Sequence, residues 1–119
     1  MDSILNSIKK LLMLDENDTS FDIDIIIHIN SVLSILNQLG VGPENGFSIS
    51  DNKATWKDLL EDYPNLDTVR SFVYLKVKLL FDPPTNSAVI ESINRAAGEL
   101  EWRINATAEA IRRNVSSGS

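Results

Sequence analysis

Few residues in this sequence are suited to catalysis. His28 is the only histidine, and it lies between Ile27 and Ile29 inside an apolar helical pattern. A lone histidine supplies no catalytic triad, so we interpret it as a core or helix-edge residue rather than as a general base or a pH switch. The chain has no cysteine, which excludes disulfides, thiolate metal ligands and cysteine nucleophiles. We therefore predict no catalytic residue and expect a protein that is not an enzyme.

Two other segments contain residues typical of ligand-binding motifs, but the spacing of these residues does not fit the motifs. Five acidic side chains lie between residues 15 and 24, but the twelfth residue counted from Asp15 is Ile26, where a calcium loop of the EF-hand type needs glutamate. The glycine-containing segment 40–46 follows a helical pattern instead of a strand, and it lacks both the dinucleotide-binding spacing and a phosphate-loop lysine. We predict no metal site and no cofactor.

Charge argues against nucleic acid and lipid as partners. The chain carries 11 basic and 17 acidic side chains, which gives a formal charge of −6. Most of the excess lies in the first half, because residues 1–62 contain four basic and eleven acidic side chains. Binding to phosphate requires a basic surface that displaces counterions, so we expect no specific binding to DNA and no binding to a membrane.

The elements that would position any functional side chain are all helical. Apolar residues recur at a spacing of three or four in five segments, and the predicted helices cover residues 4–12, 21–39, 55–60, 65–81 and 86–113. Gly40 followed by Val41 predicts a Schellman end for the second helix, with a loop containing glycine and proline after it. The sequence predicts an all-α protein, a small bundle of about four to five helices. We assign residues 1–113 to one helical domain and residues 114–119 to a flexible tail.

Two further expectations concern the ends of the chain. The last predicted helix would be about 40 Å long, longer than a small core needs, so its far end should project. The residues near Met1 are acidic where an export signal would be basic, so we predict no export signal. The unbroken apolar runs are only a few residues long, such as residues 25–27, so we predict no membrane span. We expect a soluble protein that is intracellular at synthesis.

Aromatic and basic residues on these helices leave two interpretations open. Trp56 and Trp102 are expected to be core anchors rather than ligand platforms. The arginines of the last helix form either a binding strip or a solvated face, in which Glu99 and Arg103 make a favourable pair one turn apart.

Two motifs in the sequence resemble those of a known protein family. The segment 74–84, YLKVKLLFDPP, is followed by ELEWRIN at 99–105, and the segments 18–22, 29–30, 36–43 and 55–56 match the same pattern in order. Together they resemble the gp6-like head-tail connector proteins, also called head completion or adaptor proteins, of long-tailed phages and prophages. The motif residues of structural interest are Trp56, Tyr74, Phe81, Asp82, Pro83, Pro84 and Trp102.

The resemblance implies a structural virion protein. Such a protein forms a homo-oligomeric ring under the portal after DNA packaging, completes the DNA-filled head and extends the DNA channel. It also provides the docking platform for stopper or tail-completion proteins, while DNA passes through without specific binding. The implied location is the head-tail interface of the virion, reached from the host cytoplasm during assembly.

The end of the chain is predicted to dock on the portal. Residues 103–119 gather Arg103, Arg112 and Arg113 in an otherwise acidic chain, and the last six are too polar to bury themselves. In the opposite interpretation, the apolar residues of this segment complete the core of the subunit. Two other function classes stay open: a small helical DNA-binding regulator, which the charge disfavours, and a generic phage assembly adaptor.

Overall fold

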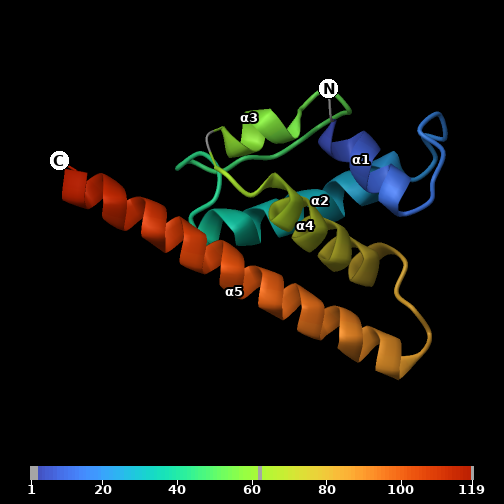
Figure 1. Ribbon diagram of the computed structural model, residues 1–119. Helices are drawn as coiled ribbons and strands as arrows, with labels where there is room; N and C mark the ends of the chain where they lie inside the picture. Colours follow the sequence, from blue (N-terminus) through green and yellow to red (C-terminus); the bar gives the residue numbers. More distant parts are fainter. Residues whose placement is uncertain (1–2, 62, 119) are drawn as a thin grey trace.

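Five helices follow one another along the part of the chain that the computed structural model describes, residues 3–61 and 63–118 (Figure 1). They are α1 (Ile4–Leu11), α2 (Asp22–Gln38), α3 (Trp56–Leu60), α4 (Leu66–Phe81) and α5 (Ser87–Gly118). In these ranges the only β interaction is an isolated antiparallel bridge between Ser3 and Thr55. The all-α prediction is confirmed.

Local sequence signals set the helix ends where they were expected. The Ser3 hydroxyl accepts a hydrogen bond from the Asn6 N–H at 3.2 Å and caps α1. Thr55 and Asp58 form a reciprocal capping box at the start of α3. At the end of α2, Gly40 has a φ of 92° and the Val41 N–H donates to the Leu36 carbonyl at 2.9 Å, which is the predicted Schellman motif.

Helix α4 lies at the centre of the bundle and packs against α1, α2 and α5. Its buried residues are Val69, Phe72, Val73 and Val77. Trp56 is 1% exposed, and its indole N–H donates to the Ser7 hydroxyl at 2.7 Å, which ties α3 to α1. Trp56 is the core anchor that the sequence predicted.

Two asparagines of α2 hold the loop between α2 and α3. The Asn30 side chain donates to the Ile49 carbonyl at 2.9 Å and accepts from the Ile49 N–H at 2.8 Å, so it pairs with the loop as a neighbouring strand would. The Asn37 side chain donates to the Pro43 carbonyl at 2.9 Å. These bonds satisfy loop backbone groups and let Ile49 bury its side chain without a sheet.

The acidic segment between α1 and α2 is organised around Lys9, which is only 1% exposed. Its ammonium group donates to the carbonyls of Glu16 at 3.0 Å and Asp18 at 2.7 Å. It also lies 2.8 Å from Asp22 Oδ1, an ion pair whose angle does not suit a hydrogen bond. Hydrogen bonds from Ser20, first from its backbone N–H, hold the pKa of the Asp18 carboxyl below its usual value. The buried ammonium group of Lys9 therefore holds the segment between α1 and α2 in place.

Helix α5 is longer than predicted. Its 32 residues span about 48 Å, and they continue five residues beyond Arg113, where a tail was expected to begin. No proline interrupts residues 114–118, so nothing in the sequence stops the ladder of backbone hydrogen bonds there. Ser119 lies outside the described residues.

The expectation that residues from Arg103 onward stay out of the core is wrong for part of the segment. Ile104 is fully buried, and Ala108 is buried one turn later against Gly40, just after the end of α2. A Cβ placed on Gly40 would lie 3.3 Å from the Ala108 Cβ, so the missing side chain of that glycine permits the close packing. Beyond Ala108 the helix leaves the core, because Ile111, Arg112 and Arg113 are exposed.

Candidate interaction surfaces

The described residues form no group of three or more histidine, cysteine, aspartate or glutamate side chains placed to hold a metal ion. His28 is half-buried, and its ring meets the edge of Phe81 at a centroid distance of 6.4 Å.

Four of the seven motif residues singled out in the sequence lie at or just after the end of α4 and have structural roles there. The Phe81 ring meets Phe21 edge-on at 5.6 Å, which links the end of α4 to the start of α2. Asp82 caps α4 and pairs with Lys78 at 2.9 Å. Pro83 and Pro84 then turn the chain toward α5, and Tyr74 is half-buried on α4. This part of the motif fixes the connection between the two helices that pack most closely.

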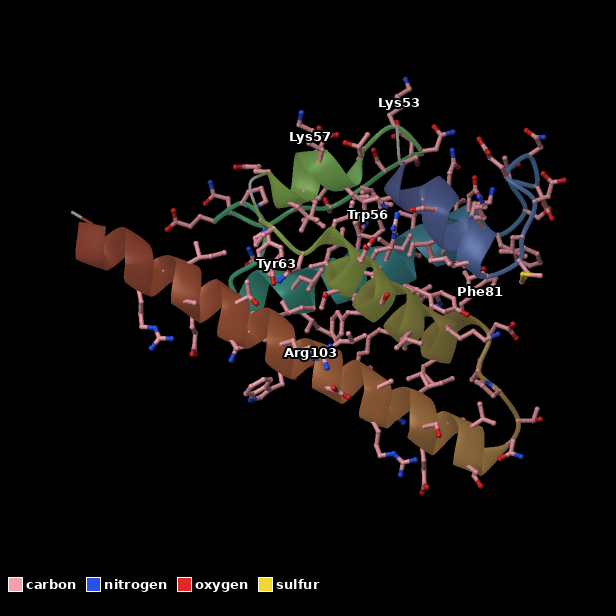
Figure 2. The ribbon with its side chains drawn as sticks, in the orientation of Figure 1. Lys53, Trp56, Lys57, Tyr63, Phe81 and Arg103 are labelled. Atoms are coloured by element: carbon pink, nitrogen blue, oxygen red, sulfur yellow. The ribbon has the colours of Figure 1, made fainter. Side chains whose placement is uncertain are left out.

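Trp102 has no such structural role, because 72% of its side chain is exposed. The expectation that it anchors the core is wrong. It lies two residues before the buried Ile104, which places it on nearly the opposite side of α5. Gly98, one turn earlier, faces open space, and Arg103 pairs with Glu99 on the exposed flank. The outward face of α5 thus presents a large exposed aromatic ring beside Arg103, which is labelled on this helix in Figure 2.

The three predicted docking arginines do not form one strip. Arg103 lies beside Trp102, and Arg113 follows Trp102 by about three turns and so lies on the same face. Arg112 lies about a quarter turn around the helix from both Trp102 and Arg113. A Cβ placed on Gly40 would lie 3.6 Å from its guanidinium carbon. There it sits over the carboxyl end of α2, where the helix dipole favours a cation.

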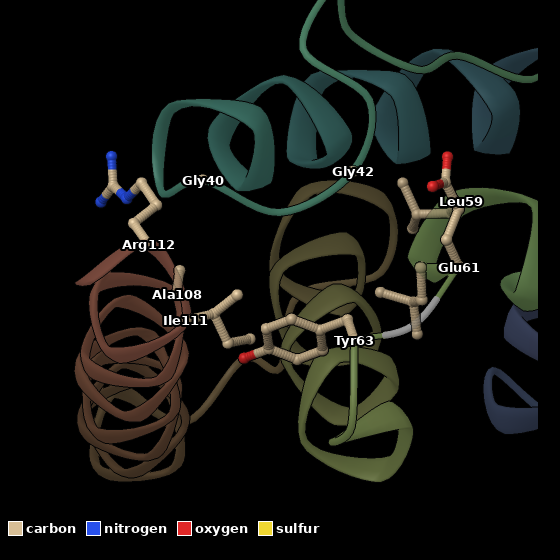
Figure 3. Close-up of a pocket in the computed structure, with 9 residues that line it drawn as sticks. Gly40, Gly42, Leu59, Glu61, Tyr63, Ala108, Ile111 and Arg112 are labelled. Atoms are coloured by element: carbon tan, nitrogen blue, oxygen red, sulfur yellow. The ribbon is translucent and has the colours of Figure 1, made fainter. Parts of the chain in front are cut away.

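Arg112 borders a cleft between the end of α5, the end of α2 and α3 (Figure 3). The cleft has a volume of about 230 Å³, and its lining residues are Gly40, Gly42, Leu59, Leu60, Glu61, Tyr63, Ala108, Ile111 and Arg112. The Tyr63 hydroxyl donates to the Ile104 carbonyl at 3.4 Å. Burial raises the pKa of Tyr63, and a hydrogen bond with Thr107 opposes that shift. The cleft is apolar inside, with Arg112 and Glu61 as its charged residues.

The comparison with protein families decides the assignment. The model of the phage connector protein family matches residues 4–110, which is most of the chain. The chain belongs to this family. Searches of curated proteins and of solved structures gave no match.

Membership in the phage connector family points to a structural phage protein at the head-tail junction and to a role without catalysis. The matched region contains the connector's α1 to α4 and Trp102, but it ends before Arg112 and Arg113. No helix in the described part of the connector is long and apolar enough to cross a membrane.

Proposed function

We propose that this connector forms a homo-oligomeric ring under the portal, completes the DNA-filled head and extends the DNA channel. The ring would also be the platform on which stopper or tail-completion proteins dock. The family match over residues 4–110 carries this proposal. Its place of action would be the virion, reached from the host cytoplasm during assembly.

Exposed apolar side chains support an assembling protein. Several large ones lie outside the core of the subunit: Met13, Phe21, Ile23, Ile27, Leu80, Val89, Trp102 and Ile111. They are distributed over more than one face, as a ring subunit requires, because it meets two neighbours through different surfaces. A subunit that also binds a portal and a stopper needs still more contact surface.

The outward face of α5 is our candidate for the portal contact. Trp102 supplies an exposed aromatic anchor of the kind that dominates binding energy in protein interfaces. Arg103, in its ion pair with Glu99, lies beside it, and Arg113 lies on the same face about three turns later. Arg112 lies about a quarter turn away and is considered below.

The connector should not bind duplex DNA at physiological salt. Its formal charge is −6, so it lacks the counterion release that gives basic proteins non-specific affinities of roughly 10⁻⁴ to 10⁻⁶ M. An acidic wall would instead let the duplex slide through the channel. A gel shift at micromolar protein checks this, and a salt-sensitive shift would favour the DNA-binding regulator.

Mass in solution tests the ring directly. Light scattering over a wide concentration range, with and without purified portal, should show a species of many subunits when portal is present. The portal is needed as a template if the contact between subunits is weak. Isolated subunits under all of these conditions would contradict the proposed ring and favour a generic assembly adaptor.

A further inference from the structure

The two ends of this subunit have complementary surfaces. We propose that the start of α2 in one copy inserts into the Arg112 cleft of the next copy, with Asp24 facing Arg112. This contact rests on the proposed ring and specifies which surfaces build it. The occupant of the cleft is thus a second copy of the chain.

The inserting surface is the first exposed turn of α2. Ile23 is 75% exposed and Ile27 is 57% exposed, and they lie one helical turn apart, so they form a short apolar ridge. Asp24 is exposed beside this ridge. The opposite side of the same helix already meets the core through Ile25 and Ile29. The ridge therefore remains for contact with another molecule.

The receiving surface is the cleft at the end of α5. Its apolar wall consists of Leu59, Leu60 and Ile111, with Arg112 at one side and Glu61 at another. A volume of about 150 Å³ holds a benzene molecule in a protein cavity, so the cleft at about 230 Å³ has room for an isoleucine side chain. The presence of Glu61 favours an orientation in which the incoming carboxylate lies on the Arg112 side.

The charges at the two ends of the subunit also favour the proposed contact. Around the start of α2 lie Asp15, Glu16, Asp18, Asp22 and Asp24, opposed by Lys10 and the buried Lys9. The charged residues that line the cleft are Glu61 and Arg112, so the cleft lacks the excess of acid found at the start of α2. An acidic end that approaches Arg112 of another copy is attracted, whereas two acidic ends repel each other.

The placement of the two surfaces favours a head-to-tail contact. In Figure 1 the loop that leads into α2 lies at one end of the molecule, and the carboxyl end of α5 projects at the other. A surface at one end that packs on a different surface at the other end is a heterologous contact, which closes into a ring when the rotation between copies allows it. Each subunit then uses its ridge once and its cleft once.

Charge reversal tests the pairing. Asp24→Arg and Arg112→Asp should each weaken portal-templated assembly by at least about tenfold, measured by light scattering against subunit concentration. The double variant that carries both substitutions should recover assembly, since the two reversed charges again meet with opposite sign across the interface. Glu91→Arg is the matched control on an exposed turn of α5 away from the cleft, and it should assemble like the unmodified chain.

The outcomes separate this contact from the ring itself. Both side chains are exposed, so each variant should still unfold cooperatively, with only the small loss of stability expected when a charge near a helix end is reversed. If the unmodified chain assembles and the single variants assemble equally well, or if the double variant fails to recover, the contact between Asp24 and Arg112 is wrong while the ring stands. If the unmodified chain does not assemble even with portal, the ring and this contact both fail.

Discussion

Replacement of Lys9 with methionine is expected to lower the free energy of unfolding by about 3 kcal/mol, the lower part of the range for breaking a buried ion pair. The substitution removes the donor to the Glu16 and Asp18 carbonyls and the cation beside Asp22. Asp22 is 23% exposed, so water reaches part of its carboxylate and the loss stays near the lower limit. Urea unfolding followed by circular dichroism measures it.

The neighbouring lysine provides the control. Lys10 is exposed, so Lys10→Met should change the free energy of unfolding by no more than about 0.5 kcal/mol. Equal effects of the two substitutions would mean that general charge, and not the buried contacts of Lys9, stabilises the segment between α1 and α2.

The two tryptophans should respond in opposite ways to truncation. Trp56→Ala removes a buried ring and its hydrogen bond to Ser7, so we expect a loss of about 3 to 5 kcal/mol of stability. Trp102→Ala removes an exposed ring, so stability should stay within about 0.5 kcal/mol.

Binding to the portal, unlike stability, should depend on Trp102. If its ring anchors the portal contact, Trp102→Ala should weaken association with portal by roughly 30-fold or more, as truncation of an interface hot spot does. Leu11→Ala, which truncates an exposed apolar side chain on α1, is the control and should bind normally. Normal portal binding by the Trp102 variant would remove the outward face of α5 from the portal interface.

Local signals in the sequence were sufficient for most of the fold. The Schellman end at Gly40, the capping box at Thr55 and the break after Phe81 each depend on a few neighbouring residues, and the helices begin or end there as predicted. Such features need no knowledge of distant contacts.

The surfaces were harder to predict because they depend on which side of each helix is covered. Lys9 follows Leu5 by four residues and so continues the buried stripe of α1, a signal that the sequence contained. The two-residue offset of Trp102 from Ile104 likewise placed it off the stripe of α5. The cleft had no such signal, since the loop after α2, the end of α3 and the later part of α5 form it from residues as far apart in sequence as Gly40 and Arg112.

The arginines near the end of α5 show the same limit of prediction from sequence. Its arginines stood out against an acidic chain, but sequence composition does not tell which of them share a face. The structure places Arg112 beside Gly40, just after the end of α2, and helical spacing puts Arg113 on the face of Trp102, so one basic strip becomes two surfaces. One faces outward, where we propose the portal, and the other borders the cleft, where we propose the next subunit.

Imaging of DNA-filled heads tests the central claim most directly. Heads purified from cells that lack this protein should show a bare portal, and addition of the purified connector should add a ring of density beneath the portal, coaxial with the DNA channel. All-helical subunits with a long α5 should fit that density. Heads that remain bare at saturating connector, or density without rotational order at another site, would contradict the account.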